Sequence, residues 1–151
     1  MTFVEKGIDF VGRGGSDNSI KGKIELQNFE PNEGNVLTAS VVGCKFARYQ
    51  PLPFYCSQNI NKLKPVFENN RSRGLFFATL VQGFLNQFNS VWDGYKIDQL
   101  RNHEIIVPVI NGEIDYDFID SFISAIQKLI IKDVVLWADK KIEATKSVVN
   151  R

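Results

Sequence analysis

The sequence predicts an α+β fold, in which a β-rich domain with short helices precedes one long C-terminal helix. Two observations lead to this prediction. Short runs of β-branched and aromatic residues, separated by glycine, proline and asparagine, fill the first half of the chain. After Gly112, no proline or glycine interrupts a helical spacing of apolar residues. We therefore expect a domain at residues 1–112 and a helical segment at residues 113–151.

Composition limits the classes of function. The chain has 151 residues, 44% of them hydrophobic, which suffices for one domain core. Two cysteines without a CxxC pair, and a single histidine, cannot supply the four ligands of a zinc site. The start of the chain has no apolar region typical of a signal peptide, and no apolar run reaches membrane-spanning length. We expect a cytoplasmic protein with reduced thiols and no membrane contact.

Charge is unevenly distributed, although the net charge is only +1. Residues 45–101 contain eight basic and three acidic residues, whereas the chain from residue 113 onward contains six basic and seven acidic ones. A basic middle and a nearly neutral C-terminal part indicate that the two parts meet different partners.

Strands are expected in the first half of the chain wherever β-type runs lie between turn residues. A glycine-rich loop is expected at residues 14–18 and a turn at residues 30–35. The predicted strands are residues 8–11, 23–26, 36–42 and 54–56, with another extended piece between Gly43 and Pro51.

Helical spacing first appears at residues 75–88, where apolar residues recur at three- and four-residue steps. A short helix capped by Asp98 is expected at residues 97–100. The β-branched run at residues 105–110 predicts a strand, followed by a turn at Asn111–Gly112.

The final helix carries the clearest signals. Asp115 is a suitable N-cap, and Ile114 can pack on Ile119 as a hydrophobic staple. Thirty-odd residues at about 1.5 Å each reach roughly 45–50 Å, too long for this domain to bury, so we expect a projecting helix that packs on another chain. A helix folded back on its own domain is the alternative. The residues expected to form the helix interface are Ile119, Phe122, Ile126, Leu129 and Trp137.

The glycine-rich turn at residues 8–15 resembles the first motif of cytosine methyltransferases, in which a strand ends in glycines that wrap the methyl donor. An S-adenosylmethionine-dependent DNA methyltransferase fragment is therefore one alternative. Against it, neither cysteine follows a proline, as the nucleophile of that family does. The segment of residues 51–54 only approaches the motif of the amino-methyltransferases.

Four segments in order resemble the DNA-specificity subunits of type I-like restriction–modification systems. They are a strand ending in Gly12–Arg13 with a polar loop and return strand, the run at residues 34–38, the aromatic strand and loop at residues 53–60, and the strand–turn–helix joint at residues 102–118. The resemblance is strongest to variants that serve combined cutting-and-methylating complexes. Full-length subunits carry two reading domains and a further leading strand, so a half-length or truncated subunit is expected.

The resemblance implies a division of labour. Residues 1–112 would be a target-recognition domain that reads one half of a bipartite site in double-stranded DNA through the major groove. The helix would be a spacer that pairs with a second copy, antiparallel, as a homodimer. A methyltransferase (modification) subunit would supply the S-adenosylmethionine chemistry and a restriction subunit the cleavage, so this chain would be no enzyme and need no cofactor. A protein–protein interaction module is the remaining alternative.

DNA binding requires cations for phosphates and forked or amide side chains for base edges. Arg13 in the glycine loop is the expected base-reading residue, and Arg71 and Arg73 are the expected phosphate contacts. A solvated surface residue is the alternative for each one. The predicted DNA-binding residues are Arg13, Asn18, Lys21, Lys45, Arg48, Tyr49, Gln50, Gln58, Arg71 and Arg73.

Overall fold

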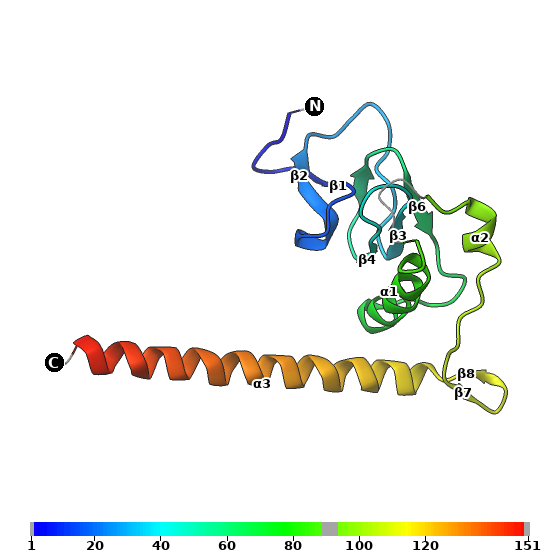
Figure 1. Ribbon diagram of the computed structural model, residues 1–151. Helices are drawn as coiled ribbons and strands as arrows, with labels where there is room; N and C mark the ends of the chain where they lie inside the picture. Colours follow the sequence, from blue (N-terminus) through cyan, green and yellow to red (C-terminus); the bar gives the residue numbers. More distant parts are fainter. Residues whose placement is uncertain (1, 89–93, 150–151) are drawn as a thin grey trace. The chain divides into compact units, whose positions relative to one another are not determined.

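The computed structural model describes residues 2–88 and 94–149, and it confirms the predicted α+β fold (Figure 1). The chain divides into two compact units, Met1–Val107 and Pro108–Arg151. Over the described residues, the first unit contains two small β-sheets and two α-helices, and the second contains a β-hairpin and a long helix.

The first sheet is built around β1 (Ile8–Val11). This strand pairs antiparallel with β2 (Ile20–Ile24) and parallel with β5 (Phe54–Cys56). Val11 and Phe54 are buried in a hydrophobic core cluster together with Val36. Because parallel strands point the same way, the segments that follow β1 and β5 leave the sheet at the same edge.

The second sheet has β3 (Val36–Ser40) at its centre, and every residue of this strand is buried. On one side β3 pairs antiparallel with β4 (Ala47–Gln50), and on the other with β6 (Ile60–Leu63). The short strands and antiparallel pairing agree with the predicted β-rich domain.

Two of the predicted strands are present with the predicted bounds, at residues 8–11 and 54–56. The strand expected at residues 23–26 is wrong in its second half, because Ile24 already pairs with the first residue of β1 and nothing extends that pairing further. The strand expected at residues 36–42 ends at Ser40, where its pairing with β6 ends. The sequence did not predict β6, whose Asn-Lys centre resembles a loop.

Helix α1 (Arg71–Leu85) begins earlier than the predicted residues 75–88, because the side chain of Asn70 accepts a hydrogen bond from the backbone of Arg73 and caps the helix. The helix packs on β4 and β3. The residues that form its contact face recur at three- and four-residue steps. The buried residues of this face are Gly74, Phe77, Ala78, Val81, Phe84 and Leu85.

The connection between the two units differs from its prediction. Helix α2 (Ile97–Arg101) is present, but Asp98 lies inside its first turn and Lys96 occupies the cap position. The strand expected at residues 105–110 is wrong for all but its last two residues, and Ile106 is 93% exposed. Only β7 (Val109–Ile110) is paired, with β8 (Glu113–Ile114), around an Asn-Gly turn whose two residues both have positive φ.

Helix α3 (Tyr116–Val149) has 34 residues, so it is roughly 50 Å long at about 1.5 Å per residue. The carboxylate of Asp115 accepts a 2.8 Å hydrogen bond from the backbone N–H of Phe118, which confirms the predicted N-cap. Within the described part of the chain, no helix has both the length and the apolar character needed to cross a membrane.

We predict that Gly74→Ala destabilises the first unit, although alanine is the better helix former. A Cβ at Gly74 would overlap the ring of Tyr49, whose hydroxyl is held by Asn35. Such overpacking costs about 1–3 kcal/mol, which outweighs the roughly 1 kcal/mol gained from helix propensity. The free energy of unfolding in denaturant measures the net effect.

Gly83→Ala is the matched control in the same helix. A Cβ there would meet nothing within 4 Å, so the substitution should raise stability by about 0.5–1 kcal/mol. Equal stabilisation at Gly74 and Gly83 would contradict the close packing of the helix on Tyr49.

Candidate nucleic-acid interface

The glycine-rich segment after β1 forms a closed loop. The backbone N–H of Gly12 donates to the carbonyl of Ser19 over 2.8 Å, and that of Ser19 donates to the carbonyl of Ser16 over 2.8 Å. The side chain of Lys21 lies across Gly12 and Gly14, where an added Cβ would overlap it. The missing side chains of these glycines therefore allow a basic side chain to lie flat on the loop.

Three loops converge at one end of the first unit. The loop at residues 12–19 follows β1 and the loop at residues 57–59 follows β5, and they are joined by a 2.9 Å hydrogen bond from Ser57 N–H to the carbonyl of Val11. The turn at residues 41–46 joins them through a 2.9 Å bond from Val41 N–H to the carbonyl of Asn59. We call these three segments the loop cluster.

Basic and amide side chains gather on the loop cluster. Arg13, Lys21 and Gln58 are exposed. Arg48 extends from β4 to donate a 3.0 Å hydrogen bond to the carbonyl of Gly15. Its guanidinium carbon lies 4.8 Å from the centroid of the Phe46 ring, a cation–π arrangement. The cluster therefore combines side chains suited to phosphates with side chains suited to base edges.

The loop at residues 12–19 is anchored by Gln50 at the end of β4, which is only 2% exposed. The amide of Gln50 donates to the carbonyl of Asn18 over 3.2 Å and to the hydroxyl of Thr38 over 3.1 Å. The side chain of Asn18 donates to the carbonyl of Tyr49 over 2.9 Å and to the amide oxygen of Gln50 over 3.3 Å. Asn18 and Gln50 thus bond to the protein itself and hold the loop in place.

Two further predicted contacts are also buried. Lys45 is 8% exposed, and its ammonium donates to the carbonyl of Gly43 over 3.4 Å. Tyr49 is 8% exposed, and its hydroxyl donates to the side chain of Asn35 over 2.8 Å. Burial raises the pKa of Tyr49 above its usual value, and the nearby Arg71 guanidinium offsets part of that rise.

The remaining two predicted contacts lie at the start of α1. Arg71 is exposed, whereas Arg73 is half-buried and donates to the carbonyl of Glu68 over 2.7 Å. These two arginines adjoin the beginning of β3, and the loop cluster adjoins its end. The five residues of β3 span roughly 13 Å, which is four steps of about 3.3 Å, so the two groups of basic side chains lie at opposite ends of this strand.

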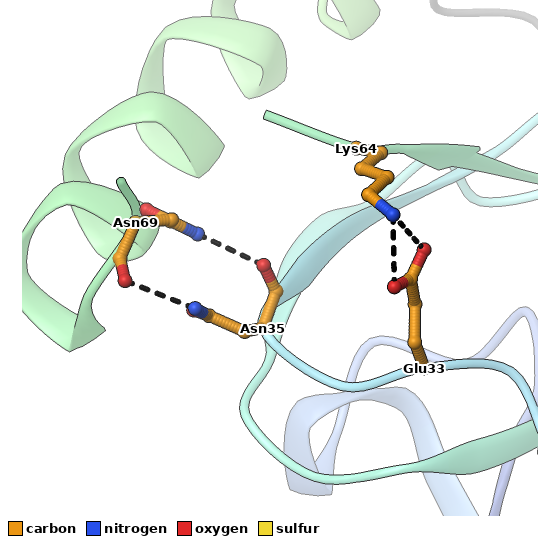
Figure 2. A network of polar contacts seen from close by, with 4 residues as sticks. All are labelled: Glu33, Asn35, Lys64 and Asn69. Carbon is orange, nitrogen blue, oxygen red and sulfur yellow. Dashed lines mark hydrogen bonds and ion pairs between the residues drawn. The ribbon is translucent and has the colours of Figure 1, made fainter. Parts of the chain in front are cut away.

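A polar network holds the segment that leads into α1 (Figure 2). The side-chain amide of Asn35 donates to the carbonyl of Asn69 over 2.9 Å, and the amide of Asn69 donates back to the carbonyl of Asn35 over 3.0 Å. Beside them, Lys64 and Glu33 form an ion pair of 2.8 Å. In the sequence, the sign of this clamp is the Gly34–Asn35 turn, because asparagine tolerates the φ of +60° found there, but its pairing with Asn69 has no local signal.

A hollow of about 750 Å³ beside β1 and β2 lies apart from these basic groups. Lys62 in its wall donates to Asn32 over 2.7 Å, and Asn32 donates to the carbonyl of Phe54 over 2.9 Å. Burial raises the pKa of the Cys56 thiol, which favours its unreactive protonated form at neutral pH. In the part of the chain that is described, no three metal-ligating side chains form a cluster.

Of the predicted helix-interface residues, Ile119 is fully buried. The other four are substantially exposed, with Leu129 and Trp137 both at 63%. The exposed apolar residues on α3 are far more numerous than those four alone, and they form a surface that water solvates poorly. The exposed predicted residues are Phe122, Ile126, Leu129 and Trp137.

Basic and amide side chains that gather on the loops of a small α+β domain are typical of nucleic-acid-binding proteins. A family model for the type I restriction modification DNA specificity domain matches residues 4–135. The chain belongs to this family, as the sequence resemblance implied, and is a DNA-recognition domain of a restriction–modification system. Specificity subunits of such systems bind DNA and associate with methyltransferase and restriction subunits. No curated protein and no solved structure matches the chain significantly.

We predict that Gln50→Ala lowers the free energy of unfolding by about 1–3 kcal/mol, because it removes the hydrogen bonds of Gln50 to Asn18 and to the buried Thr38. The same substitution at the exposed Gln58 should change stability by less than about 0.5 kcal/mol. Urea unfolding of both variants tests the contrast, and an unchanged midpoint for Gln50→Ala would remove its role as an anchor.

Proposed function

We propose that the first unit of this specificity-domain chain reads one half of a bipartite DNA site through the major groove. The observation that carries this proposal is the convergence of three loops at the ends of β1, β3 and β5, with Arg13, Lys21 and Arg48 around them. Loops held by a rigid scaffold are suited to recognition, because their side chains are free to meet a ligand while the backbone stays in place.

Within this proposal, the predicted residues have different tasks. Arg13 and Gln58 are exposed and can each contact a base bidentately, so they read sequence. Lys21, Arg48 and Arg71 contact phosphates. The buried residues Lys45, Tyr49 and Gln50 and the hydrogen-bonded side chain of the exposed Asn18 support the loops.

The proposal gives α3 the role of spacer and docking surface. Its exposed apolar residues would pair with the same helix of a second copy, antiparallel, and set the separation between the two half-sites. A methyltransferase subunit would supply S-adenosylmethionine and its chemistry, and a restriction subunit would supply cleavage. The chain itself would contribute recognition without a cofactor.

Two other classes of function make different predictions. A methyltransferase of the kind considered above requires a seven-stranded doubly wound sheet, and the described residues form two three-stranded sheets and a hairpin instead. After β1, moreover, the chain returns as an antiparallel strand. A protein–protein interaction module remains distinguishable by experiment, because it would have no affinity for DNA even at low salt.

We predict that Arg71→Ala weakens DNA binding about equally for all sequences and lowers the slope of log affinity against log salt by about one, as expected for one lost phosphate contact. Arg13→Ala should instead reduce the preference between sequences, by roughly 5- to 150-fold at one base pair. Fluorescence anisotropy with a preferred duplex and its single-base variants, at several salt concentrations, measures both effects.

Arg101→Ala is the control for charge alone, because Arg101 lies outside both basic groups and pairs with Asp98. It should leave the preference unchanged and alter affinity little. If Arg13→Ala lowers affinity without altering the preference, the residue contacts phosphate and its assignment to base reading is wrong.

We predict that Leu129→Asp shifts the chain from dimer to monomer, because it places a charge in the apolar face proposed to pair. Asp139→Asn, a change at an exposed polar position of α3, is the control and should leave association unchanged. Sedimentation equilibrium measures the association constant. A wild-type chain that stays monomeric at all concentrations would contradict the proposed pairing of helices.

A further inference from the structure

Asp17 is an exposed acid within the basic loop cluster. Across the described residues its carboxylate has no ion pair and no side-chain hydrogen bond, although Arg13 belongs to the same cluster and the side chains of Lys21 and Arg48 lie against it. None of these cations therefore forms an ion pair with it. The carboxylate remains free to accept hydrogen bonds from a ligand that the surrounding cations attract.

The backbone holds Asp17 in an unusual conformation. Asp17, Asn18 and Ser19 have φ values of +48°, +54° and +66°, so three successive non-glycine residues are left-handed. L-residues adopt this region mostly one at a time, because their Cβ crowds the following carbonyl. Such strain persists only where surrounding contacts determine the conformation, and it is concentrated at functional sites.

The contacts that hold this conformation are made by the two residues that follow Asp17. The side chain of Asn18 donates to the carbonyl of Tyr49, and the carbonyl of Asn18 accepts from the amide of the buried Gln50. Ser19 is 4% exposed, and its carbonyl accepts from Gly12. Both neighbours on the C-terminal side of Asp17 are therefore held in place, and the backbone that presents the carboxylate is fixed before any ligand binds.

The negative charge of this carboxylate affects how the chain binds DNA. A negative charge facing DNA opposes binding to every sequence, because it repels the phosphates. The repulsion is offset where the carboxylate accepts a hydrogen bond from a base. In the major groove, only the exocyclic amino groups of cytosine (N4) and adenine (N6) present donors.

We infer that Asp17 is a specificity-determining residue that accepts a hydrogen bond from an exocyclic amino group in the major groove. This inference rests on the proposed function and adds an acidic reader to the basic ones. It selects cytosine or adenine at one position and disfavours a guanine or thymine, whose major-groove edges offer only acceptors to the carboxylate.

The test uses the full chain, with wild type and Asp17→Gly selected in parallel on randomised duplexes at low salt. Glycine adopts the left-handed region without strain and has no side-chain acceptor, so the turn is retained while the hydrogen bond is lost. Wild type should enrich cytosine or adenine at one position, and the variant should lose roughly 5- to 150-fold of that discrimination. The variant should also bind arbitrary DNA more tightly, since it removes a repelling charge.

A duplex carrying an analogue without the exocyclic amino group at that position identifies the bond itself. The analogue should weaken binding by the wild type and not by the variant. Glu5→Gln removes the same charge before β1, at the end of the strand away from the loop cluster, and should leave every base preference unchanged.

The outcomes separate this inference from the proposal on which it rests. Wild-type binding with a preference that Asp17→Gly leaves intact overturns the role of Asp17 and leaves the proposed function standing. Wild-type binding without any preference overturns both the role of Asp17 and half-site reading. If the wild type binds no duplex DNA at low salt, DNA recognition by this chain and the inference fall together.

Discussion

The parallel pairing of β1 with β5 is the constraint on which the rest of the first unit depends. It places Val11 beside Cys56, and the hydrogen bond from Ser57 to Val11 continues the pairing into the loops. Two segments more than 40 residues apart therefore leave the sheet at one edge, and the pairing of β3 with β6 brings a third turn beside them. An antiparallel pairing would have sent the two loops to opposite ends of the sheet.

Polar residues in this domain have two tasks that chemical type alone does not distinguish. Arginine and glutamine side chains recognise bases elsewhere, and Gln58 and Gln50 are equally suited to that by composition. Their different surroundings give the two glutamines different tasks. Gln58 is exposed on a loop, whereas Gln50 is buried on a strand beside the central β3 and bonds to Asn18 and Thr38. The rigidity of the exposed loop depends on the buried amide.

The two units carry different physical properties, which agrees with a protein that meets two kinds of partner. Basic and amide groups are concentrated on the first unit, and exposed apolar residues on α3 of the second. The family match extends through residue 135, well inside α3, so the domain and the beginning of the helix occur together in this family. A cluster of basic and amide side chains and a helix with many exposed apolar residues are thereby combined in one chain.

Local patterns in the sequence were sufficient for α3, its Asp115 cap, the Asn-Gly turn, β1 and β5, because each depends on residues close together in the chain. Only the tertiary structure decided the extent of β2, the existence of β6 and the burial of Lys45, Tyr49 and Gln50, since these follow from which strand lies at the centre of a sheet. It likewise decided which predicted contacts share a surface. Strand pairing joins distant segments through backbone groups that every residue carries, and so it leaves little trace in the identity of the side chains.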